Sequence, residues 1–165
     1  MKKKEIFAII ILAILLCTVI LVLKNERQSP YDFLKYRKNY GKSQNATEFI
    51  YQADIGNKQH LIFYINENGN LASAIIKKGI FNYNILNISS EILLNGSDPY
   101  NFHFSSYNKG QNWIYWGSIQ DKNVKKVLID EAEAKLVDTN YDFRICYLLG
   151  TREVKSSLPN YKIIY

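Results

Sequence analysis

The chain has 165 residues, of which 47% are hydrophobic and 14% aromatic, and its formal net charge is +6. This length and composition allow one domain plus a tail and exclude a disordered or low-complexity protein. Residues 1–27 hold five of the 21 basic and two of the 15 acidic residues, so the remainder has 16 basic and 13 acidic residues, a charge of only +3. Because these basic residues are scattered, no nucleic-acid partner is predicted.

An uncharged apolar run from Ile6 to Leu23 predicts a transmembrane helix. The run has 18 residues, about 27 Å at 1.5 Å per residue, which is close to the thickness of the hydrocarbon core of a bilayer. We predict a short tail at 1–5 and a membrane-spanning helix at 6–23, whose partner is the lipid bilayer. A cleaved signal peptide is disfavoured, since the residues after Leu23 offer no pair of small residues for cleavage.

The two cysteines do not indicate a compartment. Cys17 lies inside the apolar run, so Cys146 has no partner for a disulfide within the rest of the chain. Leu15 and Leu16 precede Cys17 where a lipoprotein needs a small residue, so we interpret Cys17 as a small apolar side chain.

Basic residues flank both ends of the apolar run. Lys2, Lys3 and Lys4 precede it, and five further basic residues lie between 24 and 38, so the positive-inside rule alone does not decide the orientation. A short tail before a long domain is the usual arrangement of a signal anchor, and long domains are translocated largely regardless of charge. We therefore predict a cytoplasmic tail and an extracytoplasmic domain at the cell membrane. A membrane-tethered domain that faces the cytoplasm and binds a partner there is the alternative.

Residues 24–46 are predicted to form a linker and a short helix. Ser29 followed by Pro30 is typical of a helix start, with Ser as the N-cap and Pro at the first helical position. We expect the helix to continue to about Tyr40 and to stop at Gly41.

Residues 47–165 are predicted to form a mainly β, antiparallel domain, with α+β as the alternative class. Short runs rich in Ile, Val, Phe and Tyr alternate with Asn, Gly and Asp, a pattern typical of strands and turns. Asn68-Gly69 predicts a hairpin, since both residues tolerate a positive φ. The acidic run at 130–133 predicts a hairpin turn between 127–129 and 136–137. The spacing favours a pair of sheets or one sheet with a helix. The predicted strands are Glu48–Ala53, His60–Ile65, Leu71–Lys77, Phe81–Leu86, Tyr100–Phe104, Trp113–Ile119, Lys125–Ile129, Ala132–Val137, Phe143–Leu149 and Tyr161–Tyr165.

Aromatic residues are densest between residues 100 and 116. Strand alternation places Trp113 and Tyr115 on one face and Ile114 and Trp116 on the other, and one of these faces must belong to the core. The other interpretation is a surface that binds a partner protein or the sugars of a wall polymer. The predicted binding face consists of Tyr100, Phe102, Tyr107, Trp113 and Tyr115.

No metal or cofactor site is predicted. His60 and His103 are the only histidines, and with Cys146 they supply too few ligands for a structural zinc site. The acidic run at 130–133 lacks the alternating oxygen ligands and the turn glycine of a calcium loop.

No catalytic residue is predicted either. His103, Asp98 and Ser105 or Ser106 could form a hydrolytic triad, but the sequence has no Gly-x-Ser-x-Gly elbow. We therefore predict a non-enzymatic interaction module of the cell envelope. An envelope hydrolase is the alternative, and a protein without a ligand of its own is a third interpretation.

Three segments carry a family resemblance: residues 115–127, beginning Tyr-Trp-Gly-Ser-Ile, residues 133–137 and residues 144–147. With these segments the chain resembles small membrane-anchored and lipoprotein-type domains of Bacillus- and Clostridium-like Firmicutes. Asn82-Tyr83 stands where the resemblance leads us to expect Gly followed by an aromatic residue. No reaction is assigned to the resembling proteins, so the resemblance implies no activity and carries over no functional residues.

Overall fold

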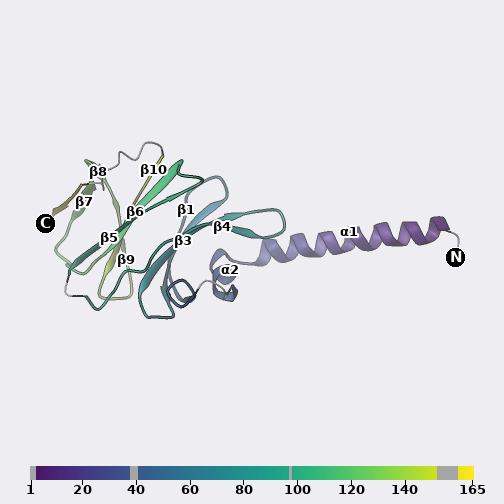
Figure 1. The fold of residues 1–165 in the computed structure, drawn as a ribbon, viewed down its shortest axis with the longest axis horizontal. Coiled ribbons are helices and arrows are strands. Elements are labelled where there is room, and N and C mark those ends of the chain that lie inside the picture. Colours follow the sequence, from purple (N-terminus) through teal and green to yellow (C-terminus); the bar gives the residue numbers. More distant parts are fainter. Residues whose placement is uncertain (1–2, 38–40, 97, 152–159) are drawn as a thin grey trace.

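The structure is a computed structural model and describes residues 3–37, 41–96, 98–151 and 160–165. Its first element, α1 (Lys3–Arg27), is a 25-residue helix that projects away from the β domain (Figure 1). The segment from Lys3 to Lys24 is long and apolar enough to cross a membrane, and none of it is buried inside the protein. The predicted apolar helix is confirmed. It begins at Lys3, so the described part of the predicted tail is helical.

The second helix, α2 (Pro30–Tyr36), begins as predicted. The backbone N–H of Asp32 donates to Ser29 Oγ at 3.0 Å, and Ser29 Oγ donates to the Asp32 carboxylate at 2.6 Å. The helix ends earlier than predicted, at Tyr36 rather than near Tyr40, a residue outside the described part of the chain. Only Phe33 and Leu34 of this helix are buried, and Arg37 leaves the helical conformation with φ −97° and ψ 76°.

Four strands form the first sheet, in the order β1-β2-β3-β4 with every pair antiparallel. They are β1 (Ala46–Asp54), β2 (Gln59–Asn66), β3 (Leu71–Lys78) and β4 (Tyr83–Ile88). β4 begins two residues later than predicted, because Phe81 lies in the turn that precedes it.

The remaining strands form two further antiparallel sheets within the described residues. The second sheet has the order β5-β6-β10-β9, and the third has the order β11-β7-β8. The mainly antiparallel β fold with one short helix is confirmed, although three sheets take the place of the predicted pair. The strand bounds are β5 (Tyr100–Tyr107), β6 (Asn112–Ile119), β7 (Lys126–Ile129), β8 (Ala132–Glu133), β9 (Lys135–Asp138), β10 (Arg144–Thr151) and β11 (Tyr161–Ile164).

Three apolar layers hold these elements together. The first and second sheets pack face to face through side chains such as Phe63 and Trp116. Phe33 and Leu34 of α2 cover the other face of the first sheet, and the third sheet packs on the other face of the second. The order is therefore α2, first sheet, second sheet, third sheet, which explains why residues 61–66 of β2 are all buried rather than alternating. Figure 1 places α1 and the C-terminal strand at opposite ends of the molecule.

Two predicted hairpins form with altered details. Residues 66–70 join β2 to β3 as expected, but only Gly69 is left-handed, with φ +76°. Asn66 Oδ1 closes this turn by accepting from the N–H groups of Asn68 and Asn70, each at 3.0 Å.

The second hairpin joins β7 to β8 through two left-handed residues, Asp130 and Glu131. The prediction of one strand from Ala132 to Val137 was wrong. The chain changes sheets at the buried Ala134, and residues 135–138 pair with β10 instead of β7.

Candidate functional site

The predicted aromatic face lies on the outer side of β5 and β6, where the third sheet packs. Tyr100, Phe102, Trp113 and Tyr115 all belong to this layer. Tyr107 does not, because it lies five positions after Phe102, an odd offset, and its ring therefore points into the core between the first and second sheets. Phe104, outside the predicted set, joins the four instead. The alternation predicted for Trp113 and Tyr115 is confirmed.

Two glycines make room for the aromatic rings on this face. Gly117 is the register partner of Phe102, and Gly150 is the partner of Trp113. A Cβ atom at Gly117 would lie 2.5 Å from Phe102 Cδ1, and one at Gly150 would lie 2.0 Å from Trp113 Cζ2. Each ring thus lies flat over a strand that carries no side chain at that position.

The third sheet covers part of the aromatic face. Phe102 packs between Tyr115, with ring centroids 5.4 Å apart, and Tyr161 of β11, with centroids 4.6 Å apart. Tyr115 is only 5% exposed, whereas Phe104 and Trp113 are half-buried with ring centroids 6.2 Å apart. Phe104 and Trp113 are therefore among the residues of the face that a partner can reach.

The face carries no charge at neutral pH. Burial raises the pKa of Tyr115 to about 12. The hydrogen bond with Tyr165, whose hydroxyl is 2.6 Å away, is the main reason that the pKa of Tyr100 is raised. Tyr100 also donates to the Asp121 carboxylate at 3.2 Å. Recognition by this face would depend on ring stacking and apolar contact, because aromatic rings bind flat apolar groups with little need for charge.

The residues that could have formed a hydrolytic triad are not bonded to one another. His103 Nε2 donates to the backbone carbonyl of Glu91 at 3.1 Å, which leaves Nδ1 to accept from Ser90 Oγ at 3.2 Å. Asp98 accepts from the backbone N–H of Tyr100. Both ring nitrogens of His103 are thus occupied without Asp98. Sequence reasoning missed Ser90, which no local motif links to His103.

Ser105, the serine considered with His103, also has another partner: its hydroxyl donates to Asn87 Oδ1 at 3.3 Å. His103 and Asp98 share only the lining of a shallow cavity of about 330 Å³.

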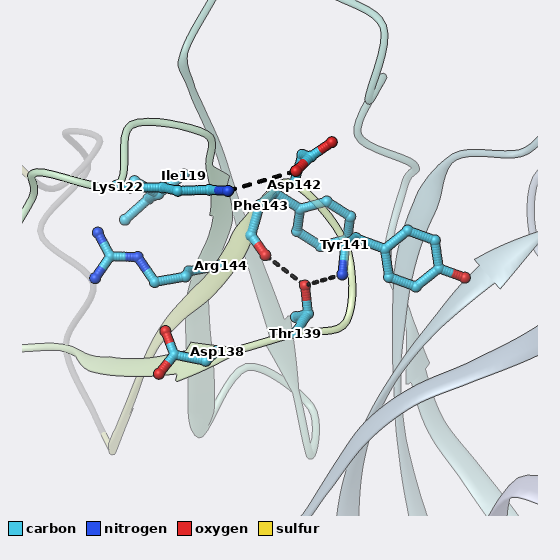
Figure 2. A pocket seen from close by; sticks show the side chains of 8 residues that line it. All are labelled: Ile119, Lys122, Asp138, Thr139, Tyr141, Asp142, Phe143 and Arg144. Atoms are coloured by element: carbon cyan, nitrogen blue, oxygen red, sulfur yellow. Dashed lines mark hydrogen bonds and ion pairs between the residues drawn. The ribbon is translucent and has the colours of Figure 1, made fainter.

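A second cavity, of about 260 Å³, lies beside the loop that joins β9 to β10. Figure 2 shows the exposed ion pair between Lys122 and Asp142, at 3.5 Å, and the hydrogen bonds of Thr139 with Phe143 and Tyr141. Arg144 donates through Nη2 to the carbonyls of Asp121 at 3.0 Å and Val124 at 2.7 Å. Through these two hydrogen bonds, Arg144 holds the loop at 121–124 against β10.

The potential metal ligands lie in different layers. His60 packs edge-to-face against Tyr83 beside α2, with ring centroids 6.1 Å apart. His103 contacts Trp116 between the first and second sheets, and Cys146 is buried under the third sheet. Among the described residues, no three His, Cys, Asp or Glu side chains gather into a group that could hold a metal ion.

No protein-family model matches the chain, and neither a curated protein nor a solved structure matches it. The resemblance to membrane-anchored Firmicutes domains therefore stays a prediction. Inference about function rests on the geometry of this chain.

Proposed function

We propose that the chain is a single-pass membrane protein of the cell envelope, whose β domain is a non-enzymatic interaction module. The observation that carries this proposal is that none of the apolar segment of α1, from Lys3 to Lys24, is buried inside the protein. Phe7 and Leu12 of α1 are 66% and 68% exposed in the isolated chain. Contact of this surface with water would cost about 25 cal/mol per Å². A bilayer core removes the cost, and a helix satisfies its own backbone groups there.

The connection between α1 and the domain supports an anchor that is retained. The Gln28 carbonyl, one residue after α1, accepts a hydrogen bond from the Tyr83 hydroxyl at 3.2 Å. Ser29 then caps α2, which is fastened to the first sheet by Phe33 and Leu34. This short, hydrogen-bonded junction favours an anchor over a cleaved signal peptide, which would leave a processing site between the two parts.

We place the β domain outside the cytoplasm. The lysines at the start of α1 and the long domain after it support this orientation, since a short basic tail is retained inside while long domains are translocated largely regardless of charge. A domain that faces the cytoplasm is the competing arrangement, and labelling of a thiol on the β domain in intact cells separates the two.

The aromatic face supports the interaction role. Phe104 and Trp113 are half-buried rings held over the second sheet, where they can stack on an envelope protein or on the sugars of a wall polymer. The engagement of both His103 nitrogens without Asp98 favours this role over the hydrolase alternative.

Pull-down from gently solubilised native membranes tests the interaction role. The full-length protein is compared with a Phe104→Ser, Trp113→Ser double variant and with a matched control, Phe49→Ser, which changes a 45% exposed ring on β1. We expect about tenfold lower recovery of an envelope component with the double variant, the result of losing about 1.4 kcal/mol of binding free energy, and unchanged recovery with the control. Equal recovery with all three proteins would exclude the aromatic face as the binding surface.

A further inference from the structure

The turn between β3 and β4 presents two large apolar side chains at its tip. Gly79 N–H donates to the carbonyl of Asn82 at 2.9 Å, so these two residues face each other and Ile80 and Phe81 form the tip between them. Their side chains are 73% and 55% exposed. Polar and small residues normally occupy such positions, and burial of these two adjacent apolar side chains in an apolar environment outside the domain would stabilise the protein.

This turn lies at the end of the domain that adjoins α1. The hydroxyl of Tyr83, which follows the turn directly, donates to the carbonyl of Gln28. In Figure 1 the hairpin of β3 and β4 is the part of the β domain that reaches furthest back along α1. Gln28 lies four residues beyond Lys24, about 6 Å along a helix axis, and each headgroup layer of a bilayer is about 5–7 Å thick. If α1 spans the bilayer, Tyr83 and the adjoining tip of the hairpin are therefore at headgroup depth.

Lysines surround the apolar tip. Lys77 is exposed at the end of β3, Lys58 is exposed on the neighbouring turn, and Lys24 is exposed at the end of the apolar part of α1. The backbone N–H of Lys78 donates to the carbonyl of Lys58 at 2.8 Å, which holds the two turns together. Two carboxylates also lie at this end, and each has a partner: Asp54 accepts from Gly56 N–H, and Asp32 accepts from Ser29 Oγ. Basic residues around an apolar tip are the arrangement that binds anionic lipid headgroups.

We infer that the tip of the β3–β4 hairpin inserts Ile80 and Phe81 into the interfacial layer of the bilayer that α1 spans, while the adjacent lysines contact lipid headgroups. The inference rests on the proposed anchoring by α1. Two attachments, the helix and the hairpin, hold the first sheet against the membrane surface. The third sheet and the aromatic face then point away from the membrane, toward partners in the envelope.

Depth-dependent fluorescence quenching tests the inference on the full chain. An environment-sensitive maleimide dye is attached to Ile80→Cys in a Cys17→Ala background, where the fully buried Cys146 stays unlabelled. The protein is reconstituted into phosphatidylcholine–phosphatidylserine vesicles, with or without lipids that carry a nitroxide near the headgroup. A second dye position, Phe81→Cys, repeats the measurement at the neighbouring tip residue.

Two control positions separate the hairpin from the anchor. Glu67→Cys places the dye on the exposed turn at the opposite end of β3, about 23 Å away for seven residues of strand. Leu12→Cys places it in the middle of α1, within reach of lipids with a nitroxide deep in the acyl chain. We expect shallow nitroxides to lower emission at positions 80 and 81 about twofold, because interfacial side chains lie about 5–10 Å into the headgroup boundary, and to leave emission at position 67 unchanged.

The outcomes are distinct. Quenching at positions 12 and 80, with none at 67, supports the inference. Quenching at position 12 with water-like emission at 80 and 81 overturns the hairpin insertion and leaves the anchor in place. No quenching at position 12 contradicts the anchor itself, and the hairpin inference fails with it.

Discussion

The indole of Trp113 lies directly over the backbone of Gly150, its register partner on β10, so closely that a Cβ atom there would be 2.0 Å from Cζ2. The same relationship joins Phe102 to Gly117. Glycine at these two positions is therefore a condition for the aromatic face, because any side chain would lift the rings off the sheet.

Replacing Gly150 with alanine should lower the free energy of unfolding by about 1–3 kcal/mol, the usual cost of overpacking. Chemical unfolding in detergent micelles, followed by tryptophan fluorescence, measures the change. Gly96→Ala is the matched control, because the nearest atom to its Cβ would be 3.8 Å away. Equal stability of the two variants would show that Trp113 does not pack on Gly150.

Phe63 tests the core between the first and second sheets. It is fully buried, and its ring contacts Trp116 and Tyr147 with centroids 5.5 and 5.7 Å away. Phe63→Ala should cost about 3–5 kcal/mol of unfolding free energy. The same unfolding measurement on Leu93→Ala, which truncates a 61% exposed side chain, should change stability by no more than about 0.5 kcal/mol. A small effect at Phe63 would mean that these sheets do not pack face to face.

We expect the Glu91 carboxylate to stabilise the fold by an amount that is lost at acidic pH. Hydrogen bonds from Asn68 and Asn66 hold the pKa of its carboxyl below the ordinary value near 4.5. A carboxyl whose pKa is lower in the folded protein stabilises the fold fully above its unfolded pKa, and this stabilisation is lost as the pH falls through the folded pKa. Melting temperatures between pH 3 and 7 should therefore fall less steeply for Glu91→Gln than for the wild type. Parallel curves would show that the carboxylate does not depend on these bonds.

Cys146 should be inert in the folded protein. Burial raises the pKa of its thiol to about 12, and the thiolate is the reactive form of cysteine. In a Cys17→Ala variant at pH 8, mass spectrometry should find no maleimide adduct until denaturant is added, and one adduct afterwards. Rapid labelling without denaturant would contradict the packing of the third sheet over β10.

Local signals in the sequence predicted most elements. The apolar run 6–23, Ser29 before Pro30, and Asn68-Gly69 each depend on chemistry within a few residues, and each element formed where predicted. The end of α2 was not predictable in this way. It depends on which helical residues meet the first sheet: Phe33 and Leu34 are buried against it, and Tyr31 contacts Phe49 with ring centroids 5.4 Å apart.

Pairing between distant segments could not be predicted from local patterns. β11 pairs with β7 more than thirty residues earlier, which creates the third sheet. The predicted strand 132–137 is divided because residues 132–133 pair with β7 in the third sheet, whereas residues 135–138 pair with β10 in the second.

In the candidate site, too, local patterns were predictable and contacts between distant segments were not. Alternation predicted correctly that Trp113 and Tyr115 share a face, because a strand has a period of two. Tyr107 was grouped with them by proximity in sequence alone, and parity places it in the opposite layer. Ser90, in a loop, contacts His103 of β5. No sequence motif has these two residue types at this spacing, so the contact was not predictable.

Topology is the measurement that tests the account most directly. A Glu67→Cys, Cys17→Ala variant carries one exposed thiol on the β2–β3 turn, since Cys146 is buried. Intact cells are treated with a membrane-impermeant maleimide, and lysed cells serve as the control. Labelling in intact cells is the predicted result and places the β domain outside the cytoplasm. Labelling only after lysis would contradict the account and place the domain in the cytoplasm.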